Sequence, residues 1–244
     1  MNALIAEVIG TMLLIYLGNG VVANVLLTKT KGHNGGWIVI TLGWGLAVYV
    51  AVLVAGPHSG AHINPAITLG LAAVGQFDWS LVLPYISAQI LGAALGSLLV
   101  WLTYFDHFKQ TENVEIKLAC YSTGPAIRRP ILNMVSELLG TFVLMFTVLY
   151  IAGPSFSADG IPNAQIGLGS LGALPVALLV TAIGLSLGGT TGYAINPARD
   201  LAPRIMHTFL PMGDKRDSDW GYAWVPIVGP LLGTLLAALL FQLL

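Results

Sequence analysis

Two stretches of the chain decide its fold, Gly60-Ala-His-Ile-Asn64-Pro65-Ala66-Ile-Thr-Leu-Gly70 and Gly192-Tyr-Ala-Ile-Asn196-Pro197-Ala198-Arg-Asp-Leu-Ala202. Each begins with glycine and then reads as helical for about ten residues, half of a bilayer-spanning helix. Asn is a favoured N-cap, and Pro suits the first helical position because that residue needs no amide partner. Both stretches therefore predict half-length helices. Non-helical backbone at membrane depth must be buried in protein or line a wet cavity. We therefore expect the pore wall to include the backbone of Gly60, Ala61, His62, Gly192 and Ala194.

The composition identifies the bilayer as the solvent of the rest of the chain. Of the 244 residues 56% are hydrophobic and 9% are charged, whereas about a quarter are charged in soluble domains. The net charge of −1 offers no basic surface to nucleic acid, and the single Cys120 excludes an internal disulfide framework. Hydropathy predicts six membrane spans, at about 3–27, 37–56, 80–104, 131–152, 173–190 and 222–244.

An internal repeat determines how these spans are arranged. Three markers recur in the same order: Ala6-Glu7-Val-Ile-Gly10-Thr11 with Ser136-Glu137-Leu-Leu-Gly140-Thr141, the two Asn-Pro-Ala triplets, and Leu91-Gly92-Ala-Ala-Leu-Gly96-Ser97 with Val228-Gly229-Pro-Leu-Leu-Gly233-Thr234. Each unit holds three spans and a half-helix, and because three is odd the second unit enters the membrane upside down. We expect one all-α membrane domain over 1–244, with inverted repeats at about 1–104 and 131–244 and a linker at 105–130.

In such a repeat the two half-helices meet at the midplane with their N-termini. Each N-terminus carries about half a positive elementary charge, which repels cations and hydronium. The amides of Asn64 and Asn196 can donate hydrogen bonds to a passing oxygen, and free carbonyls of the lead-ins can accept them. For one motif alone, a simple helix cap is an equal alternative, but the inverted duplication favours a pore for neutral hydroxylic solutes.

The duplicated Asn-Pro-Ala, the paired Glu-x-x-Gly-Thr and the helix spacing together resemble the major intrinsic protein family, the aquaporins and glycerol facilitators, over almost the whole chain. The resemblance implies a passive channel in the cell membrane, without enzymatic activity or cofactor, assembled as a homotetramer in lipid with one pore per subunit. Asp200 and Arg204, which follow the second triplet, and Pro226-Ile227 in the last span resemble the glycerol-conducting branch. Glycerol, water and similar small neutral solutes are the implied cargo.

By the same resemblance, Trp44, Gly184, Tyr193 and Arg199 would build the constriction of the pore. Arg199 would donate to hydroxyl groups and exclude cations, the two aromatic rings would face the carbon edge of a polyol, and Gly184 would leave the fourth side open. Each residue also has an alternative role that does not involve the pore. Trp44 and Tyr193 could be aromatic residues of the membrane interface, Gly184 could allow close helix packing, and Arg199 could form an ion pair with Asp200. The branch more commonly has Phe where this chain has Tyr193, which leaves the ranking of glycerol against water open.

Two carboxylates, Glu7 and Glu137, lie inside apolar runs. They could couple an ion, as in secondary transporters, but their duplication favours a structural role as acceptors for the re-entrant loops. His58 and His62 have a spacing that can suit a metal, yet they lack the Glu of a zinc-hydrolase motif, and we expect no metal site. A water-preferring aquaporin and, further away, an ion-coupled transporter are the alternatives to a glycerol channel.

The orientation in the membrane has two conflicting indications. All ten Lys and Arg fall in alternate connections, which by the positive-inside rule places those connections in the cytoplasm and both termini outside. The family resemblance implies termini inside. We follow the resemblance, because long loops count weakly in the rule and Arg199 and Arg204 would serve the pore.

Overall fold

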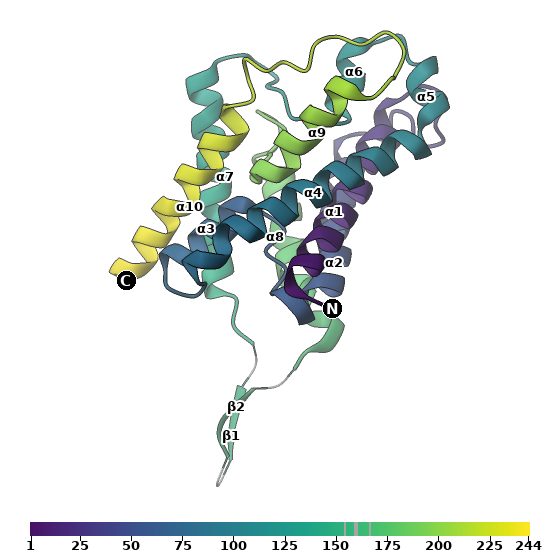
Figure 1. Ribbon diagram of the computed structural model, residues 1–244. Helices are drawn as coiled ribbons and strands as arrows, with labels where there is room; N and C mark the ends of the chain where they lie inside the picture. The colour runs from purple at the N-terminus through teal and green to yellow at the C-terminus, as the bar shows by residue number, and fades with distance from the viewer. Residues whose placement is uncertain (154, 159–160, 166) are drawn as a thin grey trace.

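The computed structural model describes residues 1–153, 155–158, 161–165 and 167–244 (Figure 1). Its helices are α1 (Ala3–Leu26), α2 (Trp37–Ser59), α3 (Pro65–Ala73), α4 (Trp79–Thr103), α5 (Phe105–Gln110), α6 (Val114–Ala119), α7 (Pro130–Tyr150), η1 (Gly169–Ala173), α8 (Leu174–Ser186), α9 (Pro197–Phe209) and α10 (Val225–Leu243). Six of these elements are long and apolar enough to cross a membrane: α1, α2, α4, α7, α10 and the continuous pair η1 and α8. The six expected spans are confirmed, each within a few residues of the sequence boundaries.

The helices pack in two groups, α1 against α2 and α4, and α7 against α10, while α8 contacts α7 less extensively and packs mainly against α2. Glycines allow the close crossings. A Cβ added at Gly96 would lie 2.5 Å from the carbonyl oxygen of Met12, and one at Gly233 would lie 2.2 Å from that of Leu138. These contacts are with backbone, which cannot move aside, so each crossing requires a residue without a side chain.

Between the two groups lie the half-helices, α3 of nine residues and α9 of thirteen. Both begin at the proline of an Asn-Pro-Ala triplet, and in both the Asn side chain caps the helix. In Figure 1 they extend from the middle of the molecule toward opposite ends. At each half-helix, the chain thus enters the helical body and leaves it again on the same face.

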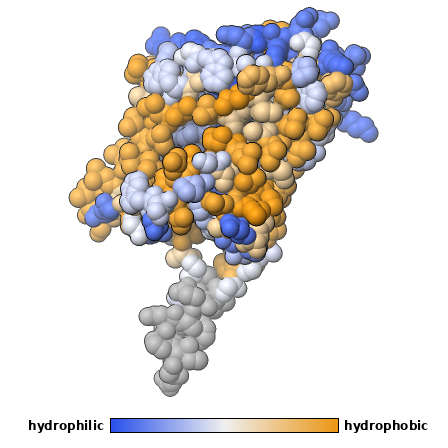
Figure 2. All heavy atoms as spheres, viewed as in Figure 1, coloured by the Kyte–Doolittle hydropathy of each residue, from blue (hydrophilic) through white to orange (hydrophobic). Residues whose placement is uncertain are grey.

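The two ends of the molecule differ. Both termini lie at the end that also carries the connection from α3 to α4, which we call the terminal end (Figure 1). The opposite loop end consists of the connections 27–36, 104–129 and 210–224, and it includes the short helices α5 and α6. Apolar side chains cover the belt between the two ends, and polar ones gather at the loop end (Figure 2).

Two local elements were not foreseen. The linker expected at 105–130 contains α5 and α6, and the connection after α7 contains a hairpin of β1 (Ser155–Ala158) and β2 (Ile161–Gln165). The two strands are antiparallel, and Ser155 pairs with Gln165. The hairpin projects from the terminal end, away from the helical body (Figure 1).

Candidate functional site

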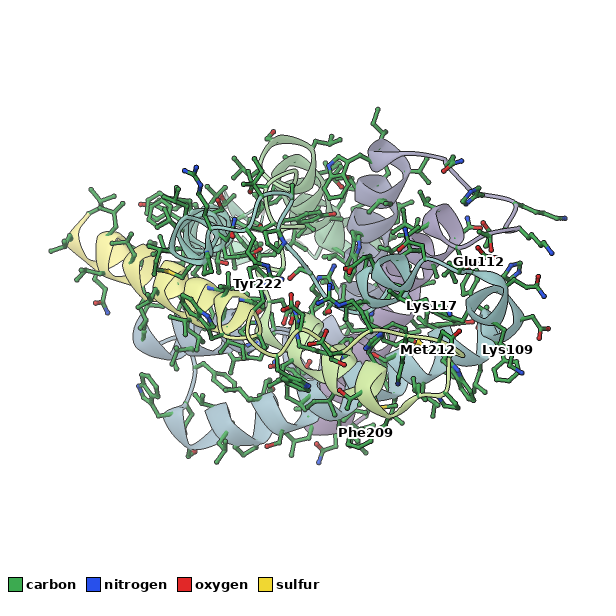
Figure 3. The ribbon with its side chains drawn as sticks, turned by 90° about the horizontal axis from the view of Figure 1, so that it is seen from above. Lys109, Glu112, Lys117, Phe209, Met212 and Tyr222 are labelled. Atoms are coloured by element: carbon green, nitrogen blue, oxygen red, sulfur yellow. The ribbon has the colours of Figure 1, made fainter. Side chains whose placement is uncertain are left out.

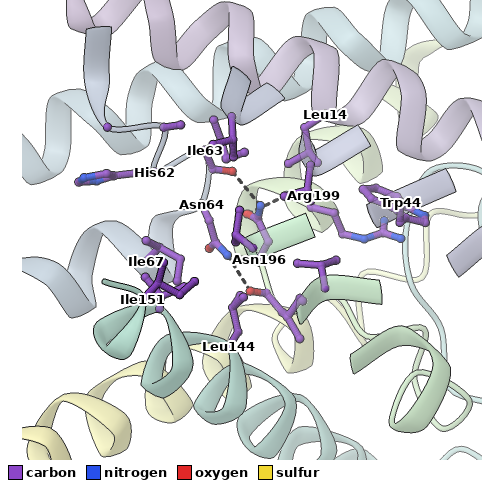
Figure 4. A pocket seen from close by; sticks show the side chains of 18 of the residues that line it. Leu14, Trp44, His62, Ile63, Asn64, Ile67, Leu144, Ile151, Asn196 and Arg199 are labelled. Carbon is purple, nitrogen blue, oxygen red and sulfur yellow. Dashed lines mark hydrogen bonds between the residues drawn. The ribbon is translucent and has the colours of Figure 1, made fainter. Parts of the chain in front are cut away.

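The site is built where the two half-helices meet. The side-chain oxygen of Asn64 accepts from the amide of Ala66 at 2.9 Å, while its Nδ2 donates to the carbonyl of Ile195 at 2.8 Å. Asn196 mirrors this arrangement: it caps its own helix and donates from Nδ2 to the carbonyl of Ile63 at 2.9 Å. These crossed hydrogen bonds, dashed in Figure 4, join the two re-entrant loops at the centre of the molecule.

Each crossed bond uses only one of the two N–H groups of its amide. The second N–H of Asn64 and of Asn196 is therefore available to a solute, and both side chains border the same cavity. The sequence did not indicate that Ile63 and Ile195 would supply the acceptors. The only sequence signal for these acceptors was that an Ile directly precedes the Asn in both motifs.

The lead-ins to both half-helices have strained backbone. Positive φ values occur at six positions, at Gly60 (80°), Ala61 (50°), Ile63 (43°), Gly192 (82°), Tyr193 (37°) and Ile195 (45°). A side chain makes this region unfavourable by about 1–3 kcal/mol per residue, and such residues persist only where their surroundings hold them. The strain recurs at equivalent places in both loops, so a matching support is expected in both.

Glu7 supports the first loop from helix α1. Its carboxylate is buried and accepts four hydrogen bonds, from Ser59 Oγ (2.7 Å), the backbone amides of His62 (2.9 Å) and Ile63 (2.7 Å), and Gln89 Nε2 (2.8 Å). Hydrogen bonds from several donors to one carboxylate compensate its loss of water.

Glu137 does the same for the second loop from helix α7. It accepts from Thr191 Oγ1 at 2.6 Å and from the amides of Ala194 at 3.0 Å and Ile195 at 2.8 Å. The two carboxylates thus bind the two strained loops in the same way, although Gln89 has no counterpart among the hydrogen bonds described for Glu137.

A cavity of about 260 Å³ passes this centre, and its lining includes Trp44 and Arg199 as well as Ile151 and Gly172. One part of its wall is apolar and comes from the spanning helices and α3: Leu14, Val48, Val52, Ile67, Leu71, Leu144, Val148, Val176 and Val180. The other part comes from the lead-ins and includes Gly60, Ala61, His62, Ala194 and both Asn side chains. The cavity is therefore amphipathic along its length (Figure 4).

Arg199, Trp44 and Tyr193 lie together at one limit of the cavity. The Arg199 guanidinium stacks on the Trp44 ring with its Cζ 4.2 Å from the ring centroid. Within the described part of the chain, Arg199 Nη1 and the Tyr193 hydroxyl are buried without a hydrogen-bond partner. Buried donors of this kind are costly unless something binds them, so they indicate where a polar solute fits.

Gly184 and Gly192 do not belong to the described lining of this cavity. Gly184 lies behind Tyr193: a Cβ at Gly184 would be 2.6 Å from Tyr193 Cζ and 2.5 Å from Thr41 Cγ2. The side that Gly184 was expected to leave open is thus occupied by the Tyr193 ring. A Cβ at Gly192 would face Thr123 instead of the cavity.

Asp200 and Arg204 form a fully buried ion pair, with Nε to Oδ1 at 2.8 Å. Asp200 also accepts from the amide and hydroxyl of Thr123, both at 2.7 Å. Arg204 donates to the carbonyls of Thr123, Ser218 and Asp219. The pair therefore connects α9 to two connections of the loop end. Asp200 pairs with Arg204 and not with Arg199, which was the alternative partner.

The His pair does not gather metal ligands. His62 Nδ1 hydrogen-bonds the Thr68 hydroxyl at 3.1 Å, and its ring packs against Phe77 and Tyr85. Among the described residues, no group of three or more His, Cys, Asp and Glu side chains could hold a metal ion.

Six spans, two half-helices that enter from opposite faces and a central amphipathic cavity define a multi-pass membrane protein with a solute site at its core. The family model described as "Major intrinsic protein" matches residues 1–241. The chain belongs to the major intrinsic protein family.

Similar proteins are known from several bacteria and from a parasite. The chain is 56% identical to the "Probable glycerol uptake facilitator protein" of Thermotoga maritima, over 99% of each chain. It is 54% identical to the "Glycerol uptake facilitator protein" of Streptococcus pneumoniae, over 100% of this chain and 99% of the other. Among solved structures, the aquaglyceroporin from Plasmodium falciparum is 31% identical, with a TM-score of 0.82 over 98% of this chain and 94% of that one.

Proposed function

We propose that this protein is a passive membrane channel for glycerol and other small neutral solutes, with water passing alongside. The amphipathic cavity carries the proposal: apolar side chains form one wall, and the opposite wall presents unpartnered donors of Arg199 and the second N–H groups of Asn64 and Asn196. A polyol has the matching shape, with hydroxyls along one edge and carbon along the other. The names of the bacterial relatives agree with this cargo.

In this proposal a solute exchanges water for fixed hydrogen-bond partners as it moves. Its hydroxyls accept from Arg199 at the constriction and then from Asn64 and Asn196 at the centre. Trp44 and Tyr193 contact its carbon edge. Because each partner replaces a lost bond to water, a neutral solute meets only small barriers.

Positive charge is repelled at two positions along the pore, the constriction and the centre. Arg199 carries a full charge at the constriction, and α3 and α9 direct the positive ends of their dipoles at the centre. The crossed amides of the Asn pair also present donors, which cannot accept a proton from a water chain. The channel is therefore proposed to exclude protons and cations.

Glu7 and Glu137 are proposed to act as structural acceptors, and Asp200 with Arg204 as a tie that holds α9. The contacts support these roles over ion coupling, because both oxygens of each glutamate already accept hydrogen bonds from loop amides or side chains. Transport is then driven only by the solute gradient, unlike in an ion-coupled transporter.

We further propose a homotetramer in the plasma membrane with both termini in the cytoplasm. Membership of the family supports the assembly and the orientation. In that orientation the loop end faces outward.

Stopped-flow light scattering on proteoliposomes tests the function. Glycerol influx should be linear in its gradient and indifferent to imposed proton or sodium gradients. Urea and longer polyols in the same assay rank the cargo, and empty liposomes are the control. Glycerol influx no faster than in empty liposomes, or influx that follows an ion gradient, would overturn the proposal.

A further inference from the structure

We propose that Trp37 is a positioning residue that sets the width of the constriction by holding Tyr193 from outside the pore. Trp37 is the first residue of α2 and lies outside the described cavity lining. It contacts the parts of the constriction wall that face away from the solute. The inference rests on the proposed constriction of Trp44, Tyr193 and Arg199.

The first contact is a hydrogen bond. Trp37 Nε1 donates to the carbonyl of Gly184 at 3.0 Å, across 147 residues of sequence. Gly184 lies in the last turn of α8, where helix carbonyls lack intrahelical partners. The indole therefore binds the end of α8 at the residue that the Tyr193 ring covers.

The second contact is with Tyr193 itself. The Trp37 and Tyr193 rings meet edge to face, with centroids 5.9 Å apart and an interplanar angle of 76°. Gly188 lies between them, since a Cβ there would be 2.5 Å from Tyr193 Cδ1 and 2.8 Å from Trp37 Cζ2. Tyr193 is thus enclosed by Gly184, Gly188 and the indole, and it has no space to move away from the cavity.

The third contact links Trp37 to the rest of α2. Thr41, one turn further along, donates its hydroxyl to the Trp37 carbonyl at 2.8 Å, and its methyl group packs beside Gly184. Trp44 follows at i+7 and carries Arg199 on its ring. One face of α2 therefore supports both walls of the constriction, Tyr193 through Trp37 and Arg199 through Trp44.

This arrangement makes the width of the constriction depend on the bulk of a residue that the solute does not touch. A smaller ring at position 37 leaves space behind Tyr193, and the Tyr193 ring can then move outward. Longer polyols should pass more easily. Proton exclusion should not change, because Arg199 and the half-helices are not altered.

The test compares Trp37→Phe with Trp79→Phe in proteoliposomes. Trp79 is the matched control, since it is the first residue of α4 and more exposed, with 59% against 39% for Trp37. The readout is the permeability ratio of a five-carbon polyol to glycerol, together with the proton leak. We expect Trp37→Phe to raise the ratio roughly threefold or more, because it removes the hydrogen bond to Gly184 and puts a smaller ring against Tyr193. The leak should stay constant, and Trp79→Phe should change neither quantity.

Two further variants make the result decisive. Trp37→Tyr has the same ring as Trp37→Phe but adds a hydroxyl, which can donate in place of the indole N–H, and it should therefore give a smaller rise. It replaces Trp37→Phe if that variant does not assemble. In a Tyr193→Ala background, Trp37→Phe should have no further effect on the ratio. An unchanged ratio in assembled Trp37→Phe, or an equal rise in Trp79→Phe, would overturn the inference while glycerol flux in the parent protein upholds the proposed function. A parent protein without glycerol flux would overturn both.

Discussion

Asn64 and Asn196 combine two tasks in one side chain. The oxygen of each amide caps its own half-helix, and one N–H fixes the opposite loop, which leaves a single N–H for the solute. Aspartate has no N–H to donate, and serine is too short to reach across. The chemistry of the centre therefore requires an amide at both positions, which accounts for the identical triplets.

Arg199 is the residue for which charge matters most. We expect Arg199→Val to raise the proton leak at least about tenfold, because a unit charge 4 Å away changes the energy of a cation by about 4 kcal/mol at an effective dielectric constant near 20. Proton conductance in vesicles that still pass water measures this. Arg129→Val, at an exposed arginine of the loop end, is the control and should have no effect. An unchanged leak in Arg199→Val would mean that the dipoles of α3 and α9 are sufficient.

Gly184 controls the position of Tyr193 from behind. Any side chain there meets Tyr193 Cζ and Thr41, so Gly184→His should push the Tyr193 ring into the cavity. Displacement of a packed ring costs about 1–3 kcal/mol, and we expect glycerol permeability to fall roughly tenfold or more while water permeability falls less. Gly189→Ala, where a Cβ would meet no atom within 4 Å, is the control. Glycerol flux at the parent rate in correctly assembled Gly184→His would remove Gly184 and Tyr193 from the constriction.

At the scale of elements, the half-helices were predictable because their signals are local. Asn just before Pro favours the start of a helix, and about ten helical residues are too few to cross a bilayer. The ties that hold α3 and α9 were only partly predictable. Glu7 and Glu137 could be identified from their duplication, whereas Thr123, Ser218 and Asp219 come from distant loops whose contacts no local pattern encodes.

The tie between α9 and the loop end should be sensitive to charge. Asp200→Asn leaves the fully buried Arg204 without its counter-charge, which we expect to cost about 3–5 kcal/mol. Thermal unfolding in detergent should show a clear decrease in the midpoint temperature. The exposed pair of Arg216 with Asp217 is the matched control, and Asp217→Asn should cost less than about 1 kcal/mol. Equal midpoints for the two variants would show that the buried pair does not stabilise α9.

At the scale of the whole molecule, the basic side chains of the loop end bear on the orientation, for which the charge distribution and the family resemblance give opposite predictions. Basic side chains of the loop end are used as structural ties. Lys117 donates to the carbonyls of Met212 and Asp214, and Figure 3 shows Lys117 close to Met212. Lys215 donates to three carbonyls at the end of α9. A count of Lys and Arg cannot distinguish such ties from free cytoplasmic charges.

The spans, the repeat and the central amides could thus be predicted from the sequence, because hydropathy and motif spacing are properties of the linear chain. The position of the Tyr193 ring over Gly184, the support by Trp37 and the hairpin of β1 and β2 could not. The first two depend on contacts between α2, α8 and the second lead-in, which only the assembled fold brings together. The hairpin lies in a connection without a membrane-spanning pattern.

The orientation can be tested by cysteine labelling, because Cys120, the only cysteine of the sequence, should not react with the label. Cys120 is buried, and burial raises the pKa of its thiol, so a maleimide should not label the parent protein. Lys31→Cys introduces an exposed thiol at the loop end, and Gln76→Cys introduces one at the terminal end. With a membrane-impermeant maleimide on intact cells, we expect Lys31→Cys to be labelled at once and Gln76→Cys only after permeabilisation. Retained glycerol flux shows that each variant is assembled. The reverse labelling pattern would place both termini outside, and the positive-inside rule would then be right for this chain.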